Sequence, residues 1–178
     1  MTWSKRPKLW RRWRVAAAIR HTIALAADAT GVPLTHCVRP QLAQELARAR
    51  RYQRPLTVAV VRLEADASVE RTDLLLALGG NGTVPHSQLP FFLVGAVLRD
   101  AVRGSDLVTY DATHDQYIIL FTESTKLQTL QAAHRLQALV STRTRLGMRI
   151  GLAEFPADGL TLEDLITMAC SEVAKEVR

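Results

Sequence analysis

The chain has 178 residues, and 48% of them are hydrophobic, which is enough for one domain with a sizeable core plus an extension. Residues 1–14 contain six basic residues and no acidic ones, so they account for the whole formal net charge of +6. Because the rest of the chain is neutral, the charge pattern argues against a basic face that binds nucleic acid, and we expect no nucleic-acid partner.

Two cysteines, Cys37 and Cys170, are too few for a disulfide framework and lack the spacing of a metal site. A reducing cytoplasm suits such a chain. No run reaches the roughly 18 apolar residues of a membrane span, because Arg20 and His21 interrupt the apolar residues of 15–27. We therefore expect a cytoplasmic protein without a signal peptide, with peripheral contact at the inner face of the membrane left open.

The N-terminal segment, residues 1–27, is expected to form a basic, tryptophan-containing arm that continues into an alanine-rich helix. Trp3, Trp10 and Trp13 have the spacing of one helix face. Together with the basic residues of 1–14, they could lie on an anionic membrane surface, where each basic side chain contributes about 1 kcal/mol. The alternative is a solvated arm whose tryptophans pack on the domain or on a second copy of the chain.

Residues 28–33 are rich in turn formers, and the elements that follow alternate between helical and strand-like periodicity. Residues 65–90 give the weakest indication of secondary structure in the chain. Within them, 74–78 favour a helical turn, and the glycine-rich 79–82 favour a flexible loop over a phosphate-binding loop, because no Lys-Ser/Thr follows. In chain order, the clear elements are a helix at 40–52, a strand at 56–64, a buried helix at 90–102, strands at 107–110 and 116–121, a helix at 125–140, a strand at 148–155 and a helix that starts at Thr161.

Local signals define the ends and faces of these helices. Pro40 can open the first one, and Thr161 can cap the last one, with Asp164 in the position of a capping box. The helix at 125–140 is amphipathic. Its inward side is expected to hold Leu127, Leu130, Ala133, Leu136, Leu139 and Val140.

The strands at 107–110 and 116–121 flank the polar residues 111–115 and predict a β-hairpin. The turn holds one histidine and two aspartates. These side chains either face solvent in an ordinary loop or form part of a functional site. A hairpin inserted among α/β crossovers predicts one mixed sheet covered by helices.

Several segments in the expected order resemble GGDEF domains, a family that makes or senses cyclic di-GMP. Residues 28–33 look like the opening Asp-x-Leu-Thr-Gly-Leu of the family, and 44–52 are similar to its first helix. Arg-Gly-Ser-Asp at 103–106 matches the Arg-x-x-Asp that precedes its signature hairpin, and 149–159 resemble its Ser-Ile-Gly-Ile-Ala and Pro-x-Asp-Gly segment. The resemblance implies an α/β (α+β) domain over 28–178, with a palm-like mixed, mainly antiparallel sheet of about five strands, flanked by helices and preceded by an N-terminal helix.

The resemblance also implies which chemistry to look for. Active members join two GTP molecules, and Mg²⁺ held by carboxylates neutralises the developing charge. By the resemblance, Arg62 takes the place of the metal-binding aspartate of the first strand, with Glu64 at the next inward site. In the signature turn both glycines are replaced, and Gln116 stands where a carboxylate belongs. The degenerate turn reads Thr113, His114, Asp115, Gln116 and Tyr117. We therefore expect a degenerate domain that is not an enzyme and holds no metal or cofactor.

Three functions remain open at this point. In the family, the Arg-x-x-Asp sequence binds the product as an inhibitory site, so Arg103 and Asp106 could bind cyclic di-GMP. Alternatively, Arg103 ends a helix and Asp106 caps the following turn, and the domain is a homodimerising, protein-binding or membrane-binding module with no nucleotide ligand. A third alternative is an unrelated nucleotide-binding α/β domain, in which His114 beside Asp115 is the one histidine placed to join a site.

Overall fold

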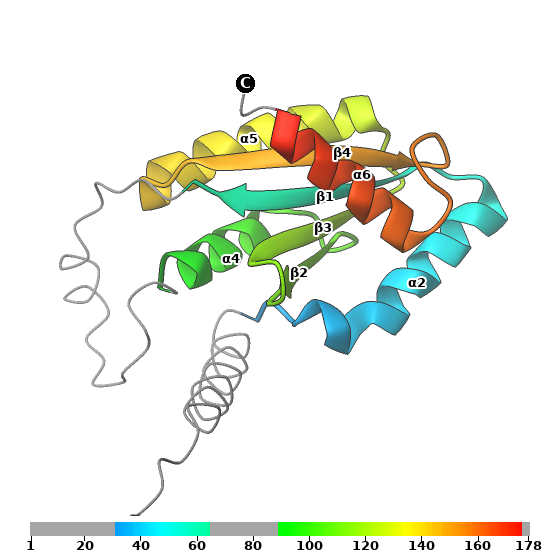
Figure 1. Cartoon of the computed structure of the whole chain (residues 1–178), viewed down its shortest axis with the longest axis horizontal. Helices are drawn as coiled ribbons and strands as arrows, with labels where there is room; N and C mark the ends of the chain where they lie inside the picture. The colour runs from blue at the N-terminus through cyan, green and yellow to red at the C-terminus, as the bar shows by residue number, and fades with distance from the viewer. Residues whose placement is uncertain (1–30, 65–88, 176–178) are drawn as a thin grey trace, which may run out of the picture.

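The computed structural model describes residues 31–64 and 89–175, and Figure 1 shows how their helices and strands are arranged. The expected arm and helix at 1–27, the helical turn at 74–78 and the loop at 79–82 lie outside the described residues. No helix in the described part of the chain combines the length and apolar character that crossing a membrane requires. The described elements are α2 (Thr35–Tyr52), β1 (Leu56–Leu63), α4 (Leu89–Ala101), β2 (Leu107–Asp111), β3 (Gln116–Thr122), α5 (Lys126–Thr144), β4 (Met148–Phe155) and α6 (Leu162–Lys175).

The strands form one antiparallel sheet in the order β2-β3-β1-β4. This confirms the predicted order of helices and strands, the hairpin of β2 and β3, and a mainly antiparallel sheet flanked by helices. The predicted number of strands was about five, whereas the described residues form four. The parallel pairing among them is an isolated bridge between Leu34 and Tyr110.

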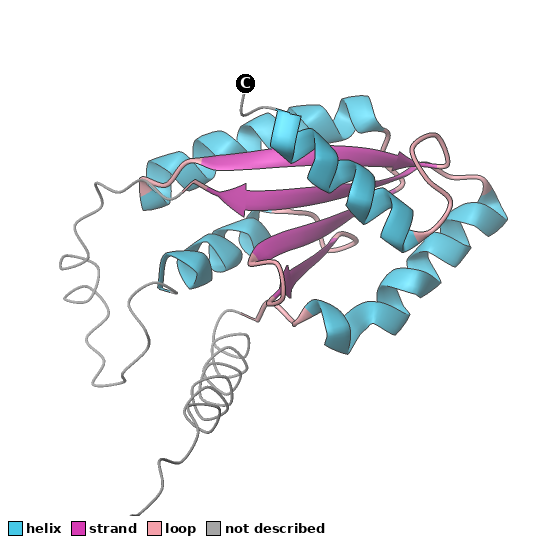
Figure 2. Cartoon of the chain, viewed as in Figure 1, coloured by secondary structure: helices cyan, strands magenta, loops and turns pink. Residues whose placement is uncertain are grey.

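Helices cover both faces of the sheet, which Figure 2 shows in magenta. α2 and α6 pack on one face, and α4 and α5 pack on the other. The side chains of β1 alternate between these two cores, because successive residues of a strand point to opposite faces. Val58 and Val60 are buried in the core with α2 and α6, and Ala59 and Val61 in the core with α4 and α5. The same alternation places Arg62, near the end of β1, on the α2 and α6 face.

The start of α2 differs from the prediction. We expected Pro40 to open the helix, but α2 begins at Thr35, and Pro40 lies inside it. A proline in this position lacks the N–H that would bond to the carbonyl four residues earlier, which removes one hydrogen bond. The apolar stripe that follows, Leu42, Leu46 and Ala49, is buried as predicted. Its burial holds the helix in place despite the missing bond.

The inward face of α5 also differs from the prediction. The capping box formed by Thr125 and Gln128 starts the helix, and the buried side chains are Thr129, Ala133, Leu136 and Val140. Leu127 and Leu130 were predicted to face inward, but they are 71% and 44% exposed. The helix is rotated so that the polar Thr129 lies in the buried stripe. The two leucines lie beside Ile150 and Leu152 in a shallow apolar depression.

β4 lies at the edge of the described sheet, and acidic side chains bind backbone amides along it. Glu172 Oε2 accepts a hydrogen bond from the Leu152 amide at 3.1 Å, and Asp158 Oδ2 accepts one from the Glu154 amide at 2.8 Å. Lys126 Nζ donates to both acids, at 3.2 Å to Asp158 and 2.8 Å to Glu172. Burial would lower the pKa of Lys126, but these hydrogen bonds outweigh it and raise the pKa. The network ties the edge of the sheet to α5 and α6.

Replacing Lys126 by methionine should lower the free energy of unfolding by about 1 kcal/mol at neutral pH, because both acids lose their charged partner. The pKa of Lys126 is raised in the folded state, so its contribution is fully present below its ordinary pKa of 10.5 and is lost as the pH rises through the folded pKa. Urea unfolding measures both effects. Lys175→Met, at an exposed lysine of α6, is the matched control. Equal losses in the two variants would contradict the role of the network.

Candidate functional site

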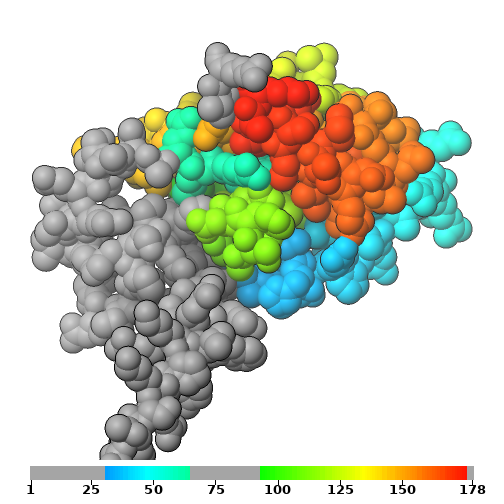
Figure 3. Space-filling model, viewed as in Figure 1, coloured from blue at the N-terminus to red at the C-terminus, as the bar shows by residue number. Residues whose placement is uncertain are grey.

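One end of the sheet carries a cavity of about 580 Å³, which we name the hairpin cleft. The hairpin contributes residues 110–114 and Gln116, and β1 contributes Arg62. The walls are formed by the first turn of α2 and by the N-terminal half of α6, through Thr35, His36, Arg39, Leu162, Glu163, Ile166, Thr167 and Cys170. On the face seen in Figure 3, the hairpin (green) adjoins the start of α2 (blue) and α6 (orange to red). The cleft is therefore built from segments that are far apart in the sequence.

Gln116 is the polar centre of this cleft. Its side chain is almost completely buried, with 1% of the residue exposed. Its Oε1 accepts a hydrogen bond from Arg62 Nε at 3.1 Å, and Cys170 Sγ lies 3.7 Å from the same oxygen. Its Nε2 donates to Asp111 Oδ2 at 3.4 Å. A neutral amide thus links a cation and a carboxylate, and it positions the Arg62 guanidinium.

Asp111 is the carboxylate next to Gln116 in the cleft, and it already accepts hydrogen bonds from its own turn. Its Oδ1 accepts from the Thr113 amide at 3.0 Å, and its Oδ2 lies 2.7 Å from His114 Nδ1. Burial alone would raise the pKa of Asp111, but the hydrogen bonds from His114 and Thr113 outweigh it and lower the pKa. Asp111 is therefore an anion that stabilises the hairpin turn.

Asp115 lies on the other side of the hairpin. It is in the left-handed region, with φ of 55°, and it accepts a hydrogen bond from the Tyr110 hydroxyl. Tyr110 packs against Tyr117, with ring centroids 5.3 Å apart, in the core shared with α4. Burial and the hydrogen bond to Asp115 raise the pKa of Tyr110 far above its usual range. Asp115 is therefore held by Tyr110, away from Arg62 and the cleft.

Glu64 also lies away from the cleft. Its Oε1 is 3.3 Å from Arg149 Nε, and its side chain is 51% exposed. Arg149 is the cross-strand partner of Arg62, so the two arginines lie opposite each other on one face of the sheet. The structure thus brings Arg62, Gln116 and His114 together, and it places Glu64 and Asp115 elsewhere. Within residues 31–64 and 89–175, no group of three or more His, Cys, Asp or Glu side chains could hold a metal ion.

A second cavity, of about 290 Å³, contains Arg103 and Asp106, and we name it the arginine pocket. Asp106 Oδ2 accepts from the Arg103 amide and Oδ1 from the Thr122 amide, both at 3.2 Å. Asp106 therefore caps the turn between α4 and the hairpin, which was one of the two roles predicted for it. Each of its oxygens keeps a further lone pair for a ligand.

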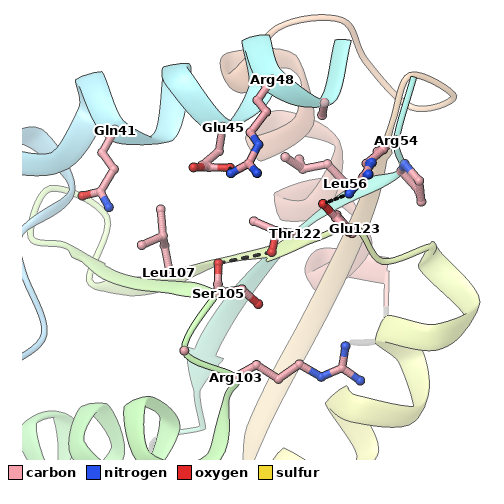
Figure 4. Close-up of a pocket in the computed structure, with 13 residues that line it drawn as sticks. Gln41, Glu45, Arg48, Arg54, Leu56, Arg103, Ser105, Leu107, Thr122 and Glu123 are labelled. Atoms are coloured by element: carbon pink, nitrogen blue, oxygen red, sulfur yellow. Dashed lines mark hydrogen bonds and ion pairs between the residues drawn. The ribbon is translucent and has the colours of Figure 1, made fainter. Parts of the chain in front are cut away.

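The guanidinium of Arg103 points away from α2. Figure 4 shows it extending toward α5, on the opposite side from Glu45 and Arg48 of the neighbouring cavity. That cavity, about 500 Å³, is lined by both signs of charge, and Arg54 pairs there with Glu123. The two pairings, Arg48 with Glu45 and Arg54 with Glu123, largely balance the charges of these four residues in the neighbouring cavity of about 500 Å³.

Arg135 of α5 was missed by the sequence reasoning, and it lines the arginine pocket with Arg103. Gln128, Gln131 and Arg135 have the spacing of one helix face, and all three line this pocket. A polar stripe on a helix whose opposite side is apolar could have pointed to this pocket from the sequence. Within the described residues, neither arginine side chain makes an ion pair. The pocket therefore brings two guanidinium groups together, with the carboxylates of Asp106 and Glu123 also in its lining.

Replacing Asp111 by asparagine should lower the free energy of unfolding near pH 6 by about 1–2 kcal/mol, because the charged acceptor of the hairpin turn is lost. Since the pKa of Asp111 is lowered in the folded state, the stabilisation is present above its ordinary pKa of 3.8. It is lost as the pH falls through the folded pKa, so the two proteins should converge in acid. Chemical denaturation across this pH range measures the difference. Asp100→Asn, at an exposed aspartate of α4, is the control, and a difference that persists in acid would contradict the assignment.

Comparisons with known proteins identify this architecture. No family model and no curated protein match the sequence. Solved structures do match: the GGDEF domain of YfiN (TpbB) from Pseudomonas aeruginosa has a TM-score of 0.64 at 18% identity, covering 82% of this chain and 84% of that chain. A sensory box/GGDEF family protein from Caulobacter crescentus has a TM-score of 0.61 at 19% identity, covering 83% and 96%. The GGDEF domain of DgcB from Caulobacter crescentus, in complex with c-di-GMP, has a TM-score of 0.62 at 12% identity, covering 83% and 86%. The resemblance seen in the sequence is confirmed at the level of the fold: this chain has the fold of a GGDEF domain.

Proposed function

We propose that this chain is a non-catalytic GGDEF-like regulatory domain in cyclic di-GMP-linked signalling. One observation carries the proposal: the polar centre of the hairpin cleft is the hydrogen bond between Arg62 and Gln116, a cation and a neutral amide. The solved structures with this fold include a GGDEF domain in complex with c-di-GMP, which makes this dinucleotide the first ligand to test.

The chemistry of the cleft supports the absence of catalysis. Joining two nucleoside triphosphates needs divalent metal ions, held by carboxylates, to neutralise the charge that develops on the phosphates. Arg62 and Gln116 stand at the positions where the resemblance expects carboxylates. A fixed guanidinium repels a divalent cation. Asp111, the carboxylate beside them, already accepts hydrogen bonds from its own turn.

Incubation of the purified chain with GTP and Mg²⁺ should yield no cyclic dinucleotide, because the described residues of the cleft include no carboxylates that converge on a metal. Chromatography of the nucleotides measures the product. The heat-inactivated chain is the negative control, and an active diguanylate cyclase is the positive control. Product above the heat-inactivated control would contradict the proposal.

We propose further that cyclic di-GMP binds in the arginine pocket. The ligand carries two phosphates, which guanidinium groups recognise as planar forks, and two guanines, whose N–H groups donate to carboxylates. Arg103 and Arg135 supply the forks, and Asp106 supplies the acceptor. Asp106 is held by two backbone amides, so the acceptor is already in place before the ligand arrives.

Titration calorimetry with cyclic di-GMP should show saturable binding to the full chain. Arg103→Ala and Arg135→Ala should each weaken it about tenfold or more, because each loses a charge-assisted contact with the ligand. Arg143→Ala, at an exposed arginine of the same helix outside the pocket, should bind like the unaltered chain. Absence of heat at high ligand concentration, or an equal loss in all three variants, would contradict this site.

The exposed apolar depression supports a second candidate, an interaction module with no nucleotide ligand. Leu127 and Leu130 are exposed above Ile150 and Leu152, and exposed apolar side chains gathered in one place are a feature of interaction surfaces. In this alternative, the partner is a second copy, another protein or a membrane surface contacted through residues 1–14. The calorimetry separates the two candidates, since only the first requires the ligand.

A further inference from the structure

We propose that the hairpin cleft binds a small organic anion with an apolar body, without a divalent metal, and that Arg62 holds the oxygen atoms of the anion. This site is separate from the arginine pocket, because the two cavities share no residue. The inference does not depend on cyclic di-GMP binding.

The orientation of Arg62 is the first support. Its Nε donates to Gln116 Oε1 at 3.1 Å, and Gln116 is fixed in turn by Asp111 and by its own burial. Neither terminal nitrogen of Arg62 makes a hydrogen bond or ion pair with any other residue in the described ranges. The guanidinium lines the cleft and is only partly exposed. It is therefore a planar fork held in one orientation before a ligand arrives, which is the arrangement that recognises a carboxylate or phosphate.

The local charges are the second support. Gln116 holds Arg62 without neutralising it. Arg149 lies directly opposite Arg62 on β4, and like charges in cross-strand positions repel each other, although Glu64, 3.3 Å from Arg149 Nε, offsets part of this repulsion. The acids of the cleft are already engaged, since Asp111 binds its own turn and Glu163 pairs with Arg39. An anion at the Arg62 fork would offset this repulsion.

The start of α2 adds to the positive potential of the same wall. Thr35 and His36 line the cleft. The N-cap residue Leu34 makes no side-chain capping hydrogen bond, and the first turn of α2 holds no acidic residue. A helix N-terminus without such groups favours an anion nearby. α6 differs, because Thr161 and Asp164 cap its start.

The other surfaces of the cleft indicate the body of the ligand. Ile118 forms part of the lining, and Leu162 and Ile166 of α6 add apolar surface. A cavity of about 580 Å³ is within the range that accommodates small organic ligands. Apolar walls around one fixed cation favour a compound with a single oxyanion head and a hydrocarbon or aromatic body. The head can be a carboxylate or a phosphate, which the experiment distinguishes.

The test is titration of the full chain in EDTA with three probes: 4-phenylbutyrate, phenyl phosphate and the neutral 4-phenylbutan-1-ol. Calorimetry or amide chemical shifts measure the dissociation constants. At least one acid should bind saturably at low-millimolar concentration or below, and the alcohol should bind about tenfold more weakly or not at all. Tighter binding of the butyrate identifies a carboxylate site, and tighter binding of phenyl phosphate identifies a phosphate site. Equal binding of the alcohol and the acids would overturn the proposal, as would no saturable binding of either acid.

Substitutions test whether the Arg62 guanidinium is the group that binds the acid. Arg62→Gln should weaken the preferred acid about tenfold or more, and Arg62→Lys should weaken it less, because lysine keeps the charge but loses the bidentate geometry. Arg54→Gln, at an arginine outside the cleft, should bind like the unaltered chain. Circular dichroism checks folding, and Arg62→Lys carries the test if Arg62→Gln does not fold. Unchanged binding in Arg62→Lys together with Arg62→Gln, or an equal loss in Arg54→Gln, would overturn the proposal.

Discussion

The side chains of β1 must alternate between two buried faces, and this constraint determines what reaches the hairpin cleft. Val58 and Val60 pack under α2 and α6, and Ala59 and Val61 pack on the opposite side. A slip of one residue would exchange these two sets, so burial fixes the register. Arg62 must then face the α2 and α6 side, where β3 presents Gln116. The composition of the cleft is thus a consequence of core packing several residues away.

The hairpin separates two sites of different chemistry. Asp106 precedes β2 by one residue and belongs to the arginine pocket, whereas Asp111 is the last residue of β2 and belongs to the hairpin cleft. Five residues of extended chain span about 17 Å. Binding in one cavity could affect the other through β2 only if this buried strand had two stable arrangements. The two cavities can be studied independently because no side chain lines both.

Much of this fold could be predicted from the sequence, because its elements follow simple periodicities. The apolar run of β1, the hairpin and the capping box of α6 all depend on short-range patterns, and all are present. The faces of helices were harder to predict. Leu127 and Leu130 fit the helical period, yet the buried stripe of α5 runs through Thr129, because contacts with α4 and β4 set the rotation of the helix.

The site could be predicted only in part, for a related reason. Arg62, Gln116, Arg103 and Asp106 stand in recognisable sequence positions, and the structure places them in cavities. The side of the hairpin taken by Asp115 depends on a left-handed backbone and on the buried Tyr110 hydroxyl, neither of which the sequence specifies. Arg135 reaches the arginine pocket only through the packing of α5 against α4.

The acidic caps on β4 have a consequence for how copies of this domain can assemble. An exposed strand edge is a template on which a neighbouring chain can continue the sheet, the route that leads to fibrils. Here the carboxylates of Glu172 and Asp158 already occupy the amides of Leu152 and Glu154. An incoming strand would have to displace two charged acceptors before gaining its first bond there. At this edge, growth of a sheet between molecules is therefore disfavoured.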